Sequence, residues 1–223
     1  MDHDTARARM IRHQLRARGV DDTSLLSAFG VVARHRFAPA GLAPAQVYTD
    51  GKLRLGPGPG QWLEEPIVAA QILQQLAIEP GTHVLEVGTG SGYTAALLAE
   101  LGAQVATVEF DAALSHAAEA RLRDLASRRS GASGGATERG SVRWANHCGR
   151  SGWPQQAPFD RVWLSGGVEQ LDATLRDQIA PDGFVIAPLG RPHRQQLVCA
   201  RPRGAGWDIE PRGACRFEML TNS

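Results

Sequence analysis

Three alternate glycines, Gly88, Gly90 and Gly92, follow a short apolar run at residues 84–87 and precede a segment of helical character. Alternate glycines let the backbone turn sharply and let a ligand approach where a Cβ would clash, and the free N–H groups of a following helix face that ligand. The spacing is G-x-G-x-G, unlike the G-x-G-x-x-G of dinucleotide sites, and no Lys-Ser/Thr pair follows to grip a phosphate. The segment indicates a nucleotide-binding turn that does not hold a pyrophosphate.

A carboxylate is expected beside this turn, because residues 104–109 read as a second strand that ends in Glu109. Ligands in open α/β sheets bind outside the carboxyl ends of neighbouring strands, so Glu109 and the turn should line one crevice. A carboxylate there can accept hydrogen bonds from both hydroxyls of a ribose. A ribose with a compact charged tail and no pyrophosphate fits S-adenosylmethionine, which we expect as the cofactor.

The composition limits the classes of partner. The 223 residues include 24 Lys and Arg against 23 Asp and Glu, so no global field attracts nucleic acid or a membrane surface, and we expect neither as a partner. Three widely spaced cysteines (Cys148, Cys199 and Cys215) argue against a disulfide framework and favour the cytoplasm. No apolar run approaches the roughly 20 residues of a membrane span. The histidines and cysteines lack metal-binding spacing, so we expect no metal. We expect the chain to be a monomer or a weak homo-oligomer.

Helical and extended patterns alternate after an N-terminal helical region. We expect helices at residues 4–18, 23–32, 66–76, 94–101, 112–125 and 171–179. We expect strands at residues 84–87, 104–109, 142–144, 161–164, 183–186, 196–201 and 214–220. The two Pro-Gly steps in residues 53–60 predict an irregular loop with a defined conformation. The Gly, Ser and Ala of residues 127–141 predict a flexible insertion within the domain.

Alternation of strand and helix is typical of a parallel sheet. We therefore predict an α/β fold with a mostly parallel sheet, an N-terminal helical cap and an antiparallel C-terminal edge. The chain is expected to be one domain, in which residues 1–80 form the cap and substrate loop and residues 81–223 the cofactor-binding sheet.

Several separated segments match one family in the same order along the chain. They are R-H-R-F-A-P at residues 34–39, Y-T-D at 48–50, the turn at 86–93, G-W-P with A-P-F-D at 152–160, and P-L-G at 188–190. On these segments, residues 10–220 resemble the protein-L-isoaspartate O-methyltransferase family. The resemblance implies the Rossmann-like sheet of class I S-adenosylmethionine-dependent methyltransferases, that donor, and a peptide carboxylate as acceptor.

The resemblance also implies roles for individual residues. The family's loop G-x-G-Q-T-I-S-x-P corresponds to residues 58–66, where Trp62 and Glu64 replace Thr and Ser. We expect Gln61, Trp62 and Leu63 to contact the acceptor and Glu64 to stand at the catalytic position. Cys148 replaces an aspartate that accepts from the adenine amino group. The expected cofactor-binding residues are Glu86, Gly88, Thr89, Gly90, Ser91, Gly92, Glu109 and Cys148.

Methyl transfer from a sulfonium is an in-line displacement, so the main task of such a site is to hold the acceptor oxygen behind the methyl carbon. A carboxylate acceptor is already ionised and needs no base, whereas a hydroxyl or amine makes Glu64 or His147 the candidate base. The predicted activity is O-methylation of an L-isoaspartyl side chain, a protein-repair reaction.

Two alternatives remain open. One is a divergent methyltransferase for a natural-product or modified-peptide acceptor, which Trp62 and Glu64 favour. The other is a catalytically silent domain that binds the donor and regulates a partner.

Overall fold

The computed structural model describes residues 1–58, 60–130 and 140–220. The helices are α1 (His3–Met10), α2 (Thr23–Val31), α3 (Pro44–Val47), α4 (Pro66–Leu76), α5 (Tyr93–Glu100), α6 (Ala112–Ser130) and α7 (Ala173–Arg176). The strands are β1 (Leu53–Arg54), β2 (Trp62–Leu63), β3 (His83–Val87), β4 (Gln104–Glu109), β5 (Ser141–Asn146), β6 (Phe159–Leu164), β7 (Ile179–Arg191), β8 (Arg194–Arg203) and β9 (Gly206–Cys215).

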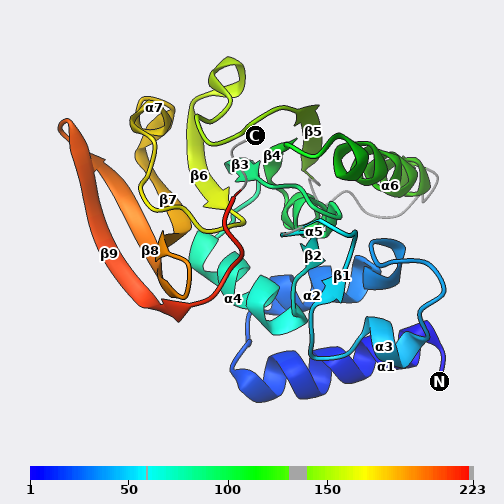
Figure 1. Ribbon diagram of the computed structural model, residues 1–223. Helices are drawn as coiled ribbons and strands as arrows, with labels where there is room; N and C mark the ends of the chain where they lie inside the picture. Colours follow the sequence, from blue (N-terminus) through cyan, green and yellow to red (C-terminus); the bar gives the residue numbers. More distant parts are fainter. Residues whose placement is uncertain (59, 131–139, 221–223) are drawn as a thin grey trace.

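The main sheet has the strand order β5-β4-β3-β6-β7-β8-β9 (Figure 1). Strands β3 to β7 pair in parallel, and β8 and β9 add antiparallel pairs at one edge. The chain runs outward from β3 to β5 and then returns to the other side of β3 with β6. Such a switch point opens a crevice at the carboxyl ends of the strands, directly beside β3. The predicted mostly parallel sheet with an antiparallel edge is confirmed.

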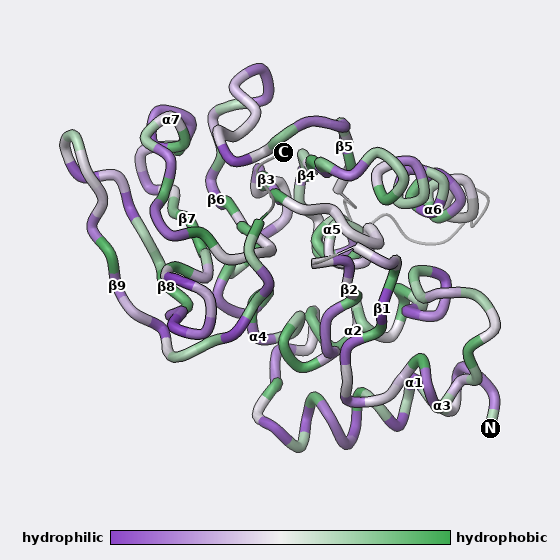
Figure 2. The backbone as a smooth tube through the Cα atoms, in the orientation of Figure 1, coloured by the Kyte–Doolittle hydropathy of each residue, from purple (hydrophilic) through white to green (hydrophobic). Residues whose placement is uncertain are grey.

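The sheet buries an apolar face on each side, because alternate side chains of a strand point in opposite directions. In β6, Trp163 packs on the side of the N-terminal helices, α4 and α5, while Val162 and Leu164 face the opposite side with Leu175 of α7. The helices also differ in hydropathy. In Figure 2 the outer helix α1 is mainly hydrophilic, whereas α4 is mainly hydrophobic.

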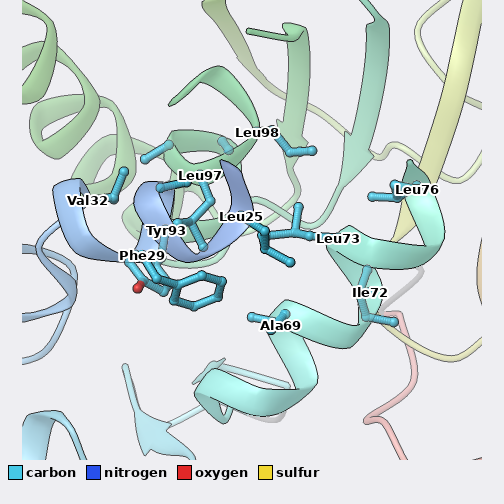
Figure 3. Close-up of a cluster of buried hydrophobic side chains, with 14 of the residues drawn as sticks. Leu25, Phe29, Val32, Ala69, Ile72, Leu73, Leu76, Tyr93, Leu97 and Leu98 are labelled. Atoms are coloured by element: carbon cyan, nitrogen blue, oxygen red, sulfur yellow. The ribbon is translucent and has the colours of Figure 1, made fainter. Parts of the chain in front are cut away.

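Helix α4 anchors the cap to the sheet. It starts with Pro66, whose missing N–H costs nothing in the first turn, and its Ala69 and Leu73 lie in a buried cluster with Phe29 of α2 (Figure 3). Full burial of a large apolar side chain stabilises the fold by about 1.5–3 kcal/mol. This packing holds the loop that immediately precedes α4 against the carboxyl end of the sheet.

Two boundaries differ from those expected in the middle of the chain. Residues 127–130 continue α6 instead of starting a loop, because Ala, Leu and Arg around them favour helix. Residues 131–139 of the expected insertion lie outside the described residues. The helix expected at 171–179 is only the short α7, capped by Asp172, because Ile179 pairs with Phe159 and begins β7.

The predicted final strand was also misplaced. The edge strand is β9, at Gly206–Cys215, whereas residues 216–220 form only an isolated bridge between Met219 and Gly167. An exposed edge strand has no buried face to impose alternation, and Pro211 interrupts its pattern, which is tolerated at an edge. The loop expected at residues 53–60 begins in the small hairpin β1–β2. Across the described ranges, every helix is too short or too polar to traverse a bilayer.

Candidate active site

The glycine turn joins β3 to α5 at the switch point. Gly88, Gly90 and Gly92 have φ values of 93°, 54° and 86°, a region that residues with a side chain rarely adopt. A Cβ on Gly88 would lie 2.1 Å from Ser165 Oγ, and the Gly88 N–H donates to the Val108 carbonyl at 2.8 Å. Gly88 therefore meets both a conformational and a packing requirement.

Glu109, at the end of β4, lies directly against this turn. Its Oε2 accepts from the Gly90 N–H at 2.8 Å, and its Oε1 accepts from the Asp111 N–H at 3.0 Å. A carboxylate has about four lone-pair positions, so both oxygens keep capacity for the hydroxyls of a ligand. The predicted proximity of Glu109 and the turn is present in the structure.

Glu86 is the buried acid of the site, with 1% of its surface exposed. Thr107 Oγ1 donates to Glu86 Oε2 at 2.7 Å, and Thr89 Oγ1 lies 2.6 Å from Thr107 Oγ1. Burial raises the pKa of Glu86 to about 8, the hydrogen bond from Thr107 opposes that rise, and the charge of Glu109 adds to it. A cation bound nearby would favour the ionised form of Glu86.

These groups line a cavity of about 370 Å³, which lies within the roughly 300–1,000 Å³ typical of small-molecule sites. Its acidic lining residues are Glu64, Glu86, Glu109, Asp111 and Glu218. Among the described residues that line it, none is Lys, Arg or His. Such a lining favours a cationic ligand and disfavours a pyrophosphate. The residues present thus fit a nucleoside that carries a sulfonium and an ammonium group.

The loop around β2 forms the opposite wall. Gln61 Nε2 donates to Asp111 Oδ2 at 2.9 Å, and Gln61 Oε1 accepts from the Gly58 N–H at 3.0 Å. The amide of Gln61 therefore ties the loop to the start of α6. Trp62 carries the Arg54 guanidinium 4.9 Å from its ring centroid, and Leu63 is buried. All three side chains line the cavity, and their predicted contact with the acceptor stays a prediction.

Glu64 is paired with a cation rather than free. Lys52 Nζ lies 3.0 Å from Glu64 Oε2 and 3.2 Å from Oε1. Burial raises the pKa of Glu64 above its usual value, and the neighbouring ammonium opposes that rise. The structure thus holds a half-buried ion pair at the position predicted to be catalytic.

Three predicted residues lie apart from the cavity. Gly92 faces Leu122 of α6 behind the turn. Cys148 is exposed and His147 packs its ring edge-to-face against Trp153 at 5.4 Å, and the cavity lining includes neither. Their roles in cofactor binding or as a base stay predictions.

The sequence reasoning missed part of the lining. Phe110, Asp111 and Leu114 follow Glu109 at the start of α6, and Ser165 follows β6. The C-terminal residues 217–220 return to the same cavity. Position after a parallel strand could have indicated Asp111 and Ser165. The tail gives no such signal, because its return depends on the bridge from Met219 to Gly167.

Comparisons with known proteins agree with this arrangement. Residues 6–223 match the family Protein-L-isoaspartate(D-aspartate) O-methyltransferase. The chain is 41% identical over 201 residues to a protein-L-isoaspartate O-methyltransferase of Methylorubrum populi, covering 90% of this chain and 87% of that protein. A protein of the same name from Gloeobacter violaceus is 38% identical, with 95% and 97% covered.

Solved structures support the fold. A protein-L-isoaspartate O-methyltransferase matches 97% of this chain with a TM-score of 0.82 and 22% identity, and this chain covers 66% of that one. A Plasmodium falciparum protein assigned as a beta-aspartate methyltransferase, in complex with S-adenosyl-L-homocysteine, matches with a TM-score of 0.76 and 18% identity, with 99% of both chains covered. The chain therefore belongs to the protein-L-isoaspartate O-methyltransferase family.

Proposed function

We propose that this chain transfers a methyl group from S-adenosylmethionine to the side-chain carboxylate of an L-isoaspartyl residue in a peptide. The observation that carries the proposal is the acid-lined cavity between the glycine turn and the β2 loop, which fits a cationic nucleoside. When bound, this donor supplies a methyl carbon that bonds to the acceptor oxygen as its bond to sulfur breaks and sulfur keeps the electron pair. Family membership supports both the donor and the acceptor.

The turn and Glu109 form the donor side of the proposed site. Gly88, Gly90 and the backbone around Thr89 and Ser91 line the cavity and would let the donor approach closely, and Glu109 would accept from its ribose hydroxyls. The Gly90 N–H orients one oxygen of Glu109 before any ligand arrives. This preorganisation reduces the entropy lost when the donor is ordered.

Glu86 supplies compensating charge on the donor side. Its carboxyl is buried, lines the cavity and has a raised pKa, so a positive ligand stabilises its ionised form. Its role is to favour the cationic donor over the neutral demethylated product.

The β2 loop and the C-terminal residues form the acceptor side. An isoaspartyl carboxylate is ionised at neutral pH, so the protein has to position it and exclude water, and no proton transfer is required. Gln61, Trp62 and Leu63 are the proposed contacts. Glu64 serves as a base only if the acceptor is a hydroxyl or an amine.

The test uses purified protein, methyl-labelled donor and two peptides that differ only in Asp or isoAsp at one position. We expect a base-labile methyl ester on the isoAsp peptide alone. Absence of ester with tight donor binding by calorimetry would favour the silent-domain alternative. Ester or ether formation on other small molecules, without the isoAsp product, would favour the divergent methyltransferase.

Several expectations about partners and location belong with this proposal. We propose a monomer or weak homo-oligomer that acts in the cytoplasm as one unit, with residues 1–80 covering the sheet of residues 81–223. Free Cys148, Cys199 and Cys215 are consistent with a reducing compartment. Size measurement in solution and limited proteolysis test the assembly and the unit.

A further inference from the structure

A second hollow adjoins the cavity. It measures about 1,300 Å³ and lies between α4 and the segment around Cys215. The two hollows share the lining residues Glu64, Val68, Ile72, Phe217, Glu218, Met219 and Leu220. Glu64 therefore stands at the boundary between the cavity and a wider groove.

Lys52 reaches this boundary from the groove side. It lines the second hollow and places Nζ within 3.2 Å of both Glu64 oxygens, with 31% of its side chain exposed against 27% for Glu64. Its ammonium also lies 5.6 Å from the ring centroid of Phe217 on the facing segment. Lys52 is the only lysine in the chain, among 24 basic Lys and Arg residues.

The hairpin sets this pair by its register. Leu53 pairs with Leu63, and Arg54 with Trp62, so the next antiparallel positions outward are Lys52 and Glu64. Directly opposed side chains of opposite charge stabilise such a pairing. The strand entry is held as well, because the buried Arg34 donates from Nε to the Val47 carbonyl at 2.9 Å and from Nη2 to the Gly51 carbonyl at 3.4 Å. The backbone of the hairpin therefore places the two side chains of the ion pair opposite each other.

A carboxylate acceptor meets an electrostatic problem at this boundary. Every charged residue in the described part of the cavity lining is acidic, and a half-buried carboxylate at Glu64 would repel a second carboxylate more strongly than it would in water. Lys52 is the cation in direct contact with that acid, and Arg34 acts on Glu64 from greater distance. Loss of Lys52 leaves Glu64 facing the acceptor with an uncompensated charge.

We propose that Lys52 is a specificity-determining positioning residue, which admits a carboxylate acceptor by neutralising Glu64 rather than by binding the acceptor itself. This inference rests on the proposed isoaspartyl methyltransferase activity. It predicts that the effect of Lys52 on acceptor affinity exists only while Glu64 carries a carboxylate.

A double-mutant cycle tests this prediction with the intact chain. We would measure kcat and KM for an isoaspartyl peptide with the wild type, Lys52→Met, Glu64→Gln and the double variant. We expect Lys52→Met to raise KM about tenfold or more with kcat within about threefold, and to change KM less than about threefold when Glu64 is already Gln. Lys52→Arg keeps the charge and should retain most of the wild-type affinity.

Controls separate this role from general destabilisation. Arg18→Met removes an exposed cation that pairs with Asp50 and lines neither hollow, and should leave KM within about twofold of the wild type. Thermal unfolding confirms that each variant is folded. Protein labelled with ¹³C-lysine gives one side-chain signal, from Lys52, and this signal should move when Glu64 becomes Gln.

Three results would overturn the inference. The first is an unchanged KM in Lys52→Met. The second is an equal rise of KM on Lys52→Met in the wild type and in Glu64→Gln, which would mean that Lys52 contacts the acceptor directly. The third is a lysine signal whose chemical shift does not change on Glu64→Gln. A wild type that binds the donor but forms no ester on the isoaspartyl peptide would instead reject the proposed function, and the inference with it.

Discussion

The two walls of the cavity are built by different means. The wall proposed to bind the donor, here the donor wall, consists of backbone at the ends of adjacent parallel strands, where Gly90 binds Glu109 and the Glu86–Thr107 pair lies buried beneath. The wall proposed to bind the acceptor, here the acceptor wall, is a short hairpin loop held by side chains, through Gln61 to Asp111 and Lys52 to Glu64. Substitution therefore reshapes the acceptor wall at low structural cost, whereas the donor wall tolerates little change.

Gly88→Ala should damage the donor wall most. The new Cβ would meet Ser165 Oγ at 2.1 Å while the backbone keeps a φ of 93°, so we expect a loss of stability of about 2–4 kcal/mol. Gly81→Ala is the matched control, because its φ is 87° and no atom lies within 4 Å of the place that its new methyl group would take. It should cost only about 1 kcal/mol. Equal midpoints in urea unfolding for both variants would contradict the packing argument.

Glu109→Ala should weaken donor binding strongly. It removes the acceptor for the Gly90 and Asp111 N–H groups, and with it the proposed acceptor for the ribose hydroxyls. Charged hydrogen bonds contribute about 1.5–3 kcal/mol each, so we expect Kd for the donor to rise roughly 30-fold or more by calorimetry. The KM for the acceptor peptide at saturating donor should change little. A donor Kd within twofold of the wild type would remove Glu109 from the ribose site.

Glu86 should make donor binding depend on pH. Its pKa is raised to about 8, so below pH 8 the carboxyl is mostly protonated in the free protein and must lose a proton to compensate the cation. Affinity for the donor should therefore rise with pH, by up to about tenfold per unit, and level off above about pH 8.

Glu86→Gln cannot ionise and is the matched control for that pH profile. Subtracting its profile removes the contribution of other groups, including those of the donor. Parallel profiles for the wild type and Glu86→Gln would show that Glu86 does not titrate on binding.

Gln61→Leu should have the smallest effect and should fall on the acceptor side. It breaks the links to Asp111 and to the Gly58 N–H while keeping a side chain of similar size, so we expect acceptor KM to rise about fivefold through loss of these two hydrogen bonds. Donor Kd should stay within about twofold. A larger change in donor Kd than in acceptor KM would contradict the division of the cavity into two independent walls.

The donor wall could be predicted because its signals are local. Gly88, Gly90 and Gly92 lie within five residues, Glu86 lies within the apolar run that precedes them, and Glu109 ends the next strand. The parallel sheet then brings Glu109 to Gly90 with no further information, since adjacent parallel strands end at the same edge. The cofactor expected from these residues is the one that the family uses.

The acceptor wall could be predicted only in outline. The family resemblance located Gln61, Trp62, Leu63 and Glu64 on one loop. It did not indicate that Gln61 binds Asp111 or that Glu64 pairs with Lys52, because these partners are not adjacent in sequence. Lys52 lies 12 residues from Glu64 and Asp111 lies 50 residues from Gln61. The misplaced final strand had the same origin, because residues 214–220 pair with distant segments and have no pattern of their own.

The parallel α/β sheet, the glycine turn, the acid beside it and the class of donor could all be predicted from the amino-acid sequence. These features arise from residues whose conformational and solvation preferences act over a few positions. Three properties required the folded chain: the charged residues described in the cavity lining are all acidic, residues 217–220 complete that lining, and Lys52 pairs with Glu64. Those properties depend on strand register and on the return of the C-terminal residues to the cavity, which bring together charges that are distant along the chain. The energy of such charges depends on their burial, which no single segment specifies.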